Sequence, residues 1–357
     1  MGSRLKIEDE EFNRKKIYEK LQYQSRPLNY LGKMPWEVQQ RIAETNGIHY
    51  TNRVGKLKNY PVYELPVPDV KNGLMLDIGT GWGRWLVAGA KKGYIPIGID
   101  IRIEFCETSL ATLKAHNKNG YVIVADLKNL PFKSQVFNLV WSFSVIQHTH
   151  KQRMLDCLQH INRILKNTGY AFLEFPNKHG IKNRFKNVPN AETEKNNYNS
   201  WVVRYYSIST YKKIFEKIFG NFKYKNHSLI GIGILKEDLK YVSFKNKILC
   251  GISLLGSLIT KIIPGLSKFS DSIYIKAFKN KNTEAEEDDN GLELFKAAHK
   301  IDPGANLNVI HILRCPVTGG ALNLSTDKLS LISIEGKIKF PIINNIPILI
   351  ESEATSL

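Results

Sequence analysis

The sequence predicts an α/β fold in which helices cover both faces of a mostly parallel β-sheet. From residue 74 onward, short apolar runs alternate with helical stretches, and the first run ends in a glycine-rich turn. Strands that are apolar along their whole length belong in a sheet that is buried on both sides. Helices are expected at 103–116 and 151–165. The expected strands are 74–78, 94–99, 121–124, 137–143, 170–175, 222–232 and 272–278.

The chain divides into a helical extension or lid, an α/β domain, a charged linker and a small β-rich domain, over residues 1–70, 71–280, 281–305 and 306–357. Amphipathic patterns around 11–22 and 35–45 predict two helices in the extension. Later in the α/β domain, an Asn- and Lys-rich loop at 176–206 precedes a helix that Ser207 caps and Gly220 ends. An acidic run marks the linker as the domain boundary.

Charge and cysteine content limit the function. With 51 Lys and Arg against 33 Asp and Glu, the net charge is +18, which favours acidic partners such as nucleic acid, anionic lipid or phosphorylated metabolites. The lysines are scattered, so a generally basic, solvated surface explains them equally well. The four cysteines contain no C-x-x-C pair, which predicts a reducing compartment and no structural zinc.

No secretory or membrane-spanning segment is expected. The N-terminus lacks the apolar core that a secretory signal requires. The most apolar run, 248–260, has about 13 residues, whereas a spanning helix requires about 20. The sequence therefore predicts a cytoplasmic protein without an integral membrane segment, and it gives no indication of the oligomeric state.

The most informative motif follows the first expected strand. It reads Leu-Met-Leu-Asp-Ile-Gly-Thr-Gly-Trp-Gly-Arg from residue 74, so Asp77 precedes glycines at three alternate positions. Glycine lets the backbone approach a ligand closely, and open α/β folds bind ligands at this edge of the sheet. A dinucleotide fold would place its third glycine where Arg84 stands, so the spacing suits a ligand without a pyrophosphate.

Acidic residues end the next two strands in the same register. Asp100 lies about twenty residues after the first glycine, where a carboxylate can bind ribose hydroxyls. Asp126 follows the third strand, where it can accept a hydrogen bond from an adenine amino group. Either acid alone could simply cap the next helix, but three acids in register indicate a nucleoside-binding edge.

Through these residues, the segment 74–175 resembles the class I S-adenosylmethionine-dependent methyltransferase family, of the type-11 domain kind. The resemblance implies a Rossmann-like sheet and transfer of a methyl group from a sulfonium to a nucleophile on an acceptor. It also implies S-adenosylmethionine as the cofactor. The cofactor-binding residues that correspond to the family are Asp77, Gly79, Gly81, Gly83, Asp100, Asp126, Leu127 and Ser142.

Methyl transfer depends chiefly on holding donor and acceptor in line, so few catalytic side chains are expected. His148, just after the fourth strand, is the candidate base for an acceptor that must lose a proton. A helix-capping or structural histidine is the alternative. Arg84 could meet the donor's carboxylate, but a surface residue is the simpler interpretation. The chain lacks the Asp/Asn-Pro-Pro-aromatic pattern, which argues against a DNA methyltransferase that acts on exocyclic amines.

Apolar residues recur with helical spacing along 247–263. Such a helix could dock on a membrane or cover an apolar acceptor. Ordinary packing in the core is the more common explanation for this pattern.

The C-terminal segment carries a second resemblance. Residues 313–322 and 340–349, with their Phe-Pro and Ile-Pro pairs, resemble the small zinc-ribbon-like methyltransferase-activator family. Free-standing members of that family are partner subunits of tRNA, rRNA and release-factor methyltransferases. Thr318 and Ser333 stand at two of its cysteine positions, so Cys315 alone cannot complete a tetrahedral zinc site. We expect a metal-free β fold that stabilises the enzyme or docks its substrate, with an inactive structural cap as the alternative.

Together these patterns predict an S-adenosylmethionine-dependent methyltransferase that acts on a small-molecule, sugar or lipid-linked acceptor, with peripheral contact to a membrane as a further expectation. An RNA methyltransferase is the alternative, because the net charge and the relatives of the C-terminal segment point to RNA. A non-catalytic protein that binds S-adenosylmethionine or a partner is the third interpretation. The three intact acids argue against it.

Overall fold

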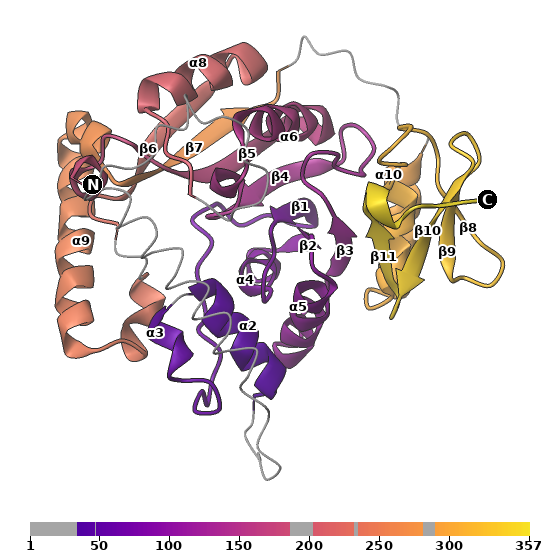
Figure 1. The fold of residues 1–357 in the computed structure, drawn as a ribbon, viewed down its shortest axis with the longest axis horizontal. Coiled ribbons are helices and arrows are strands. Elements are labelled where there is room, and N and C mark those ends of the chain that lie inside the picture. Colours follow the sequence, from indigo (N-terminus) through magenta and orange to yellow (C-terminus); the bar gives the residue numbers. More distant parts are fainter. Residues whose placement is uncertain (1–33, 47, 186–202, 232–234, 281–289) are drawn as a thin grey trace, which may run out of the picture.

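One sheet organises the protein. The computed structural model describes residues 34–46, 48–185, 203–231, 235–280 and 290–357. Within these ranges the strands form a single twelve-stranded sheet (Figure 1). The strands of the α/β domain are β1 (Gly73–Ile78), β2 (Tyr94–Asp100), β3 (Tyr121–Ala125), β4 (Phe137–Ser142), β5 (Leu165–Pro176), β6 (Phe222–Ser228) and β7 (Ser272–Phe278).

The strand order of the α/β domain is β6-β7-β5-β4-β1-β2-β3. Strands β1 to β5 run parallel, β7 is antiparallel to β5, and β6 is antiparallel to β7. Strand β1 therefore has β2 on one side and β4 on the other, and the chain order reverses there. Open α/β sheets bind ligands in the crevice outside the carboxyl ends of the strands at such a point. The predicted α/β fold is confirmed.

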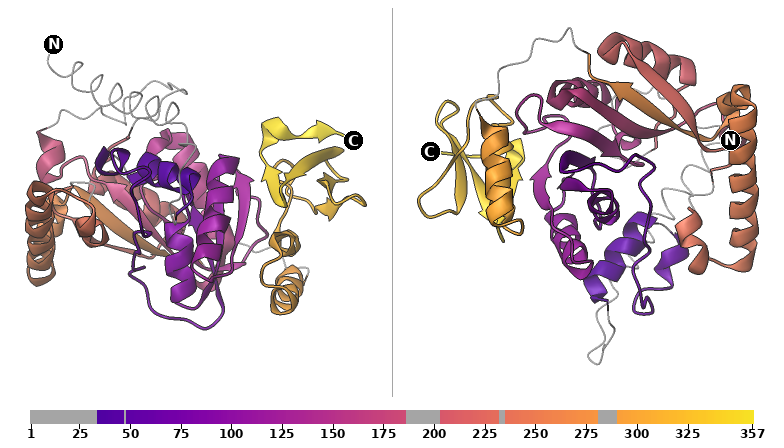
Figure 2. Two further views of the ribbon diagram at one scale, coloured as in Figure 1. Left: turned by 90° about the horizontal axis from the view of Figure 1, so that it is seen from below. Right: turned by 180° about the vertical axis from the view of Figure 1, so that it is seen from behind.

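Helices cover both faces of this sheet. The described α-helices are α2 (Trp36–Asn46), α3 (Ile48–Thr51), α4 (Arg84–Lys91), α5 (Ile103–Ala115), α6 (Lys151–Ile164), α7 (Ile181–Arg184), α8 (Ile208–Phe219), α9 (Phe244–Ile262) and α10 (Gly291–Ile301). The 3-10 helices are η1 (Ile146–His148), η2 (Lys236–Lys240), η3 (Pro264–Phe269), η4 (Asn306–Ile312) and η5 (Glu351–Glu353). Helices α4 and α5 lie on one face and α6 and α8 on the other (Figures 1 and 2).

Local sequence signals account for several of these helices. The helices expected at 35–45, 103–116 and 151–165 correspond to α2, α5 and α6. Ser207 caps α8 as predicted, because its Oγ accepts a hydrogen bond from the backbone N–H of Thr210 at 3.1 Å. The helix expected at 11–22 lies outside the described residues.

The core lies on both sides of the sheet, since successive side chains of a strand point to opposite faces. Leu76 of β1 joins the larger apolar cluster, which α6 and α8 cover. Met75 points the other way, into a cluster rich in tryptophan and tyrosine. Ile42 of α2 and Tyr63 belong to this second cluster, so the N-terminal extension packs over the face that carries the glycine-rich turn.

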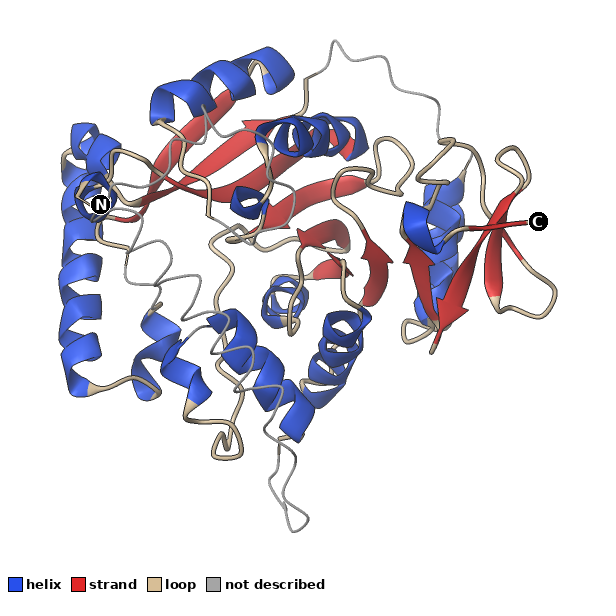
Figure 3. Cartoon of the chain, in the orientation of Figure 1, coloured by secondary structure: helices blue, strands red, loops and turns tan. Residues whose placement is uncertain are grey.

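The C-terminal module continues the sheet of the α/β domain (Figure 3). Its strands are β8 (Asn323–Leu324), β9 (Ser330–Ser333), β10 (Ile338–Ile343), β11 (Ile346–Leu349) and β12 (Thr355–Ser356). Strand β11 pairs in parallel with β3, placing Ile348 opposite Val124 and Leu349 opposite Ala125. The predicted β-rich module is therefore present, and its edge strand covers the edge that β3 would otherwise leave unpaired.

The expected linker at 281–305 differs from the structure in its second half. Residues 281–289 lie outside the described ranges, but α10 follows directly. This helix packs on β3: the rings of Phe295 and Tyr121 lie 5.1 Å apart, and the Tyr121 hydroxyl lies 2.6 Å from Nδ1 of His299. Charge alone suggested a solvated connection, whereas the apolar face of α10 packs against the sheet edge.

The helix expected at 247–263 is α9, and its environment is unexpected. Most of its large apolar side chains are exposed, so the interpretation as ordinary core packing is wrong. No helix in the described ranges has both the length and the apolar character needed to cross a bilayer.

The side chain of Asn306 joins the module to β3. Its Oδ1 accepts a hydrogen bond from the N–H of Val122 at 2.8 Å, and its Nδ2 donates to the Val122 carbonyl at 3.0 Å. The same Nδ2 also donates to the Asn345 carbonyl at 2.8 Å. The Asn306 side chain thus provides hydrogen-bond partners for buried backbone groups of strand β3.

We predict that Asn306→Ala lowers the free energy of unfolding by about 1–3 kcal/mol, because it leaves buried groups of Val122 without partners. The matched control is Asn323→Ala in β8, an exposed asparagine of the same module, which should change stability much less. Chemical denaturation of the two variants measures the difference. Equal effects would contradict the role assigned to Asn306.

Candidate functional site

The turn after β1 depends on its three glycines. Gly79, Gly81 and Gly83 have φ angles of 73°, 54° and 88°, a region that residues with a Cβ rarely adopt. A Cβ on Gly79 would lie 2.4 Å from the Val145 side chain, and one on Gly83 would lie 2.9 Å from the Ser109 backbone. The chain itself therefore requires glycine at these positions, because a Cβ would be strained or would meet neighbouring atoms. This requirement is separate from the close approach of a ligand that the sequence suggested.

Asp77 is fully buried at the carboxyl end of β1. Among the described residues, neither of its carboxylate oxygens has a hydrogen-bond partner. Burial raises the pKa of this carboxyl to about 7, although the neighbouring Thr80 side chain and, to a smaller extent, the Arg84 charge act in the opposite direction. A buried acid without a partner is costly for a fold, and a cationic or hydrogen-bonding group of a ligand would satisfy it.

Asp100 faces the same turn from the end of β2. Its Oδ2 accepts a hydrogen bond from the N–H of Gly81 at 3.1 Å, and its Oδ1 accepts one from the N–H of Arg102 at 3.2 Å. Burial raises the pKa of Asp100 to about 6, against the lowering effect of these backbone donors. The structure thus joins the second predicted acid to the glycine turn by a direct hydrogen bond.

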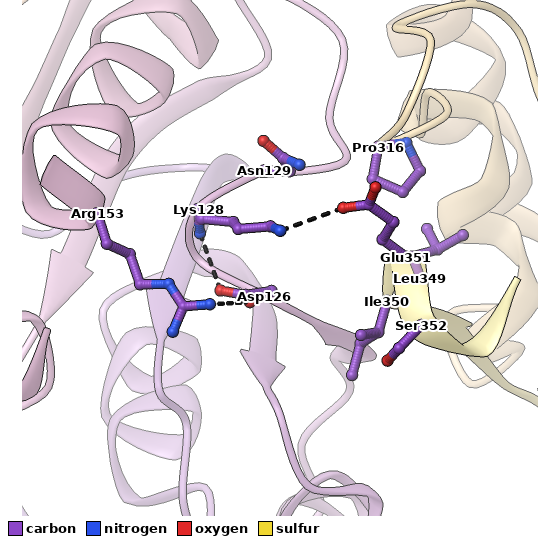
Figure 4. A pocket seen from close by; sticks show the side chains of 9 residues that line it. All are labelled: Asp126, Lys128, Asn129, Arg153, Pro316, Leu349, Ile350, Glu351 and Ser352. Atoms are coloured by element: carbon purple, nitrogen blue, oxygen red, sulfur yellow. Dashed lines mark hydrogen bonds and ion pairs between the residues drawn. The ribbon is translucent and has the colours of Figure 1, made fainter. Parts of the chain in front are cut away.

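Asp126 lies one strand further out, just after β3. Its carboxylate pairs with Nη2 of Arg153 at 2.8 Å and accepts a hydrogen bond from the N–H of Lys128 at 3.0 Å. Leu127 packs against the larger apolar cluster. Figure 4 shows the Asp126–Arg153 pair beside a pocket of about 440 Å³ between the α/β domain and the C-terminal module. The pocket is lined by Asp126, Lys128, Asn129, Arg153, Pro316, Leu349, Ile350, Glu351 and Ser352.

Ser142, the last residue of β4, is buried against β1. Its Oγ donates a hydrogen bond to the Ile78 carbonyl at 3.3 Å. In the described structure this hydroxyl ties the carboxyl ends of the two strands together. Asp77, one residue before Ile78, thus lies at the carboxyl ends of these two strands, next to the crevice.

Glu174 is a buried acid that the sequence analysis missed. Its Oε2 accepts hydrogen bonds from the N–H of Ser144 at 3.1 Å and from the Ser144 hydroxyl at 2.9 Å. Burial raises the pKa of Glu174 to about 7. The only sequence signal is one acid inside the apolar run Ala-Phe-Leu-Glu-Phe of β5. From β5, Glu174 therefore places a titratable carboxyl against Ser144, in the segment that follows β4.

His148 ends η1, on the same segment, and is half-buried. Its carbonyl accepts a hydrogen bond from Nη1 of Arg204 at 2.8 Å. The capping role considered for His148 belongs to His150, whose Nδ1 accepts a hydrogen bond from the N–H of Arg153 at the start of α6. The helix-capping interpretation of His148 is wrong.

Arg84 begins α4 and is half-buried, so its interpretation as a surface residue is also wrong. Its guanidinium carbon lies 5.1 Å from the ring centre of Tyr63 and 5.3 Å from those of Trp85 and Phe143. Cations over aromatic faces gain an attraction that grows when water is excluded. The arginine thus lies in an aromatic cage next to Asp77.

Asn46, at the end of α2, connects this cage to the N-terminal extension. Its Oδ1 accepts hydrogen bonds from Nη1 of Arg84 at 3.0 Å and from the Trp82 indole at 3.1 Å. Its Nδ2 donates to the Tyr63 hydroxyl at 2.7 Å, and that hydroxyl donates to Asp238 at 2.5 Å. No spacing in the sequence indicated this network, because its members come from distant segments.

The C-terminal module brings Cys315, Thr318 and Ser333 together. Burial opposes ionisation of the Cys315 thiol, but hydrogen bonds from Thr318 and Ser333 bring its pKa below the ordinary value. One thiol and two hydroxyls are a poor donor set for zinc. Within the described ranges, no group of three or more His, Cys, Asp or Glu side chains could hold a metal ion.

Comparison with known proteins identifies the α/β domain. Residues 75–169 match the family described as "Methyltransferase domain". This match confirms the methyltransferase class of the domain and, with it, S-adenosylmethionine as the cofactor predicted from the sequence. An uncharacterised protein of Methanocaldococcus jannaschii, MJ1252, is 28% identical over 153 residues, which cover 43% of this chain and 55% of that protein. The chain thus spans about half the length of this relative.

Two further comparisons concern the C-terminal module and the overall fold. A UPF0434 protein of Pseudomonas aeruginosa is 49% identical over 49 residues, which cover 14% of this chain and 80% of that protein. A structure of the Haloferax volcanii Trm112 methyltransferase activator in complex with a methyltransferase matches with a TM-score of 0.40 and 16% identity, over 60% of this chain and 85% of that chain. That likeness is too distant to support any argument about partners.

We predict that Gly79→Ala destabilises the protein by roughly 1–3 kcal/mol, because alanine is strained at this φ and its methyl group would meet Val145. Gly251→Ala is the matched control, since a Cβ there has nothing within 4 Å. Denaturant unfolding of both variants checks this. A stable Gly79→Ala protein would show that the turn is not fixed as described.

Proposed function

Through its C-terminal segment this chain belongs to the UPF0434 family, and we propose that the whole chain is an enzyme. Its methyltransferase domain would methylate a small-molecule, sugar or lipid-linked acceptor. One observation carries the assignment of the site. The fully buried Asp77 carboxylate has no partner among the described residues, and it stands beside the glycine turn at the switch point of the sheet.

The residues around β1 and β2 would hold the donor. Bound S-adenosylmethionine supplies a methyl group activated by a sulfonium. Asp77 would accept a hydrogen bond from its ammonium group, which the orphan carboxylate fits in charge and in hydrogen-bonding capacity. Asp100 would exchange part of its contact with the glycine turn for ribose hydroxyls. Asp126 would reach the adenine only by loosening its ion pair with Arg153.

The acceptor would lie beyond the donor, toward β4 and β5. Trp85, Trp141 and Phe143 form aromatic contacts there, with ring centres 4.9 Å (Trp85–Trp141) and 5.2 Å (Trp85–Phe143) apart. The caged Arg84 provides a positive charge, and α2 covers this side of the sheet. A covered aromatic site with the cations of Arg84 and Lys225 against its rings suits a compact or lipid-linked acceptor better than an extended polynucleotide, which needs an open basic groove.

Positioning would supply most of the catalysis, because the methyl group transfers in line between two held partners. A base is needed only if the acceptor nucleophile carries a proton. His148 and Glu174 would both lie on the acceptor side, and burial raises the pKa of Glu174 to about 7, which suits proton transfer near neutral pH. Either residue would take the proton from the acceptor as the new bond to carbon forms.

The C-terminal module would act as a built-in stabiliser of the donor site. Strand β11 pairs with the carboxyl half of β3, immediately before Asp126. Lys128 also bridges the two parts through an ion pair with Glu351 at 3.1 Å. The module would thereby fix the position of the third acid.

RNA methylation is the second candidate. The net charge of +18 favours a polyanion, and the C-terminal module resembles activators of tRNA and rRNA methyltransferases. A steep decrease of RNA affinity with salt would support this alternative, and an absence of RNA binding would remove it.

The affinity for S-adenosylmethionine should fall below pH 7. Burial raises the pKa of Asp77 to about 7, so acid protonates the carboxyl that would receive the ammonium group. We expect up to about a tenfold loss per pH unit below 7, measured by titration calorimetry. Asp77→Asn should bind weakly with little pH dependence above the pKa of Asp100, which burial raises to about 6, while the exposed Asp327→Asn should behave as the unmodified protein. An unchanged pH slope in Asp77→Asn would assign the titration to another group.

Transfer from donor labelled in its methyl group identifies the acceptor class. An extract incubated with the protein is separated into lipid, small-molecule and RNA fractions, and we expect the label in one of the first two. Asp77→Ala is the negative control. Label that nuclease treatment releases would instead establish the RNA alternative, and donor binding without any transfer would favour the non-catalytic interpretation.

A further inference from the structure

Helix α9 is oriented with its small and polar residues toward the protein. Ser253 and Thr260 are 7% and 4% exposed, and Cys250 is also buried. The large apolar residues on the other side are exposed: Leu255 is 60% exposed and Ile262 is 81% exposed. Helices of globular proteins normally bury their apolar face, so this orientation is the reverse of the usual one.

The exposed side chains form one broad face. Residues spaced by three and four along a helix lie on the same side, and the exposed apolar residues of α9 follow that spacing. We call this surface the α9 face. It comprises Phe244, Ile248, Leu249, Ile252, Leu254, Leu255, Leu258, Ile259, Ile262 and the adjoining Ile263.

Specific contacts fix this orientation. The Ser253 hydroxyl lies 3.0 Å from the Ser228 hydroxyl and donates to the Ile230 carbonyl at 3.0 Å. Gly256 packs so closely that a Cβ there would lie 2.6 Å from the Leu229 side chain. The buried hydroxyl of Thr260 donates to the Ser257 carbonyl of the same helix. Turning the helix over would break these bonds and place large side chains where only glycine and serine fit.

The charged residues of the segment that carries α9 are all lysines. Residues 239–270 contain no Asp or Glu, and their lysines are Lys240, Lys245, Lys247, Lys261 and Lys268. The acids that flank this segment, Asp238 and Asp271, are buried and engaged: Asp238 with the hydroxyls of Tyr50 and Tyr63, Asp271 with backbone N–H groups. Glu237, the acid that acts on Cys250 of α9, pairs with Lys236. An exposed apolar face with the exposed Lys247 and Lys261 on the same helix is complementary to an anionic lipid surface.

Within the described ranges, the surface around α9 is open to a large partner. The helix runs along the outer edge of the molecule, at the end opposite the C-terminal module (Figures 1 and 2). Basic and apolar side chains continue from η3 onto α7, where Arg184 lies 5.6 Å from the Phe269 ring and Phe185 is 83% exposed. Pairing of two copies through this face would bring their lysines together, which like-charge repulsion disfavours.

We propose that α9 docks on the surface of an anionic lipid bilayer, with its axis parallel to the membrane and the α9 face at the boundary between headgroups and acyl chains. The lysines bind the lipid phosphates, and the apolar side chains leave water. This docking rests on the orientation of α9 and does not require the proposed methyltransferase activity.

Flotation with lipid vesicles tests the docking on the full chain. The protein should float with phosphatidylcholine vesicles that contain phosphatidylglycerol and bind phosphatidylcholine alone much more weakly. Leu255→Glu should lower the partition coefficient at least about tenfold, because it puts a charge where an apolar side chain leaves water. The matched control is Leu294→Glu on α10, a leucine that is 53% exposed at the opposite end of the molecule and should leave the partition unchanged.

Further measurements separate the electrostatic contribution to binding from effects of the substitutions on folding. Lys247→Glu combined with Lys261→Glu should remove the preference for phosphatidylglycerol, and salt should weaken binding of the unmodified protein. Calorimetric titration with S-adenosylmethionine and far-UV circular dichroism show that each variant is folded. Failure to float, or equal flotation of Leu255→Glu, would overturn the proposal. Self-association that Leu255→Glu abolishes would assign the α9 face to a second copy instead.

Discussion

The turn after β1 is the constraint on which the rest of the site depends. Three glycines at positive φ reverse the backbone within a few residues, and Asp100 holds the turn through the N–H of Gly81. Because the turn is so tight, Trp82 and Arg84 emerge at the start of α4 and meet Asn46 of α2. The N-terminal extension is thus fixed to the motif by polar contacts as well as by packing.

The sequence predicted the parts that depend on local patterns, and it missed those that depend on contacts between distant segments. Apolar runs located the strands, and Ser207 marked the start of α8 through its cap. The β3–β11 pairing joins residues more than two hundred positions apart, and no local signal specifies such a partner. The acids of the predicted site followed from register, whereas Arg84 and Glu174 acquire their surroundings only in the folded chain.

Helix α9 shows a further limit of predicting structure from the spacing of apolar residues. The spacing of apolar residues defines a face, but it does not say whether that face meets protein or solvent. The small residues on the opposite side, Ser253 and Gly256, decide the orientation because they allow close packing against 228–230. The pattern of small residues was therefore as informative as the pattern of large ones, and it was available in the sequence.

The continuous sheet has a consequence for stoichiometry. A strand supplied by a separate subunit would have to be found by diffusion. Here the strand that completes the sheet is encoded in the same polypeptide, so its effective concentration is set by the length of the connection and not by expression. Each methyltransferase domain is therefore made together with one copy of the strand that extends its sheet.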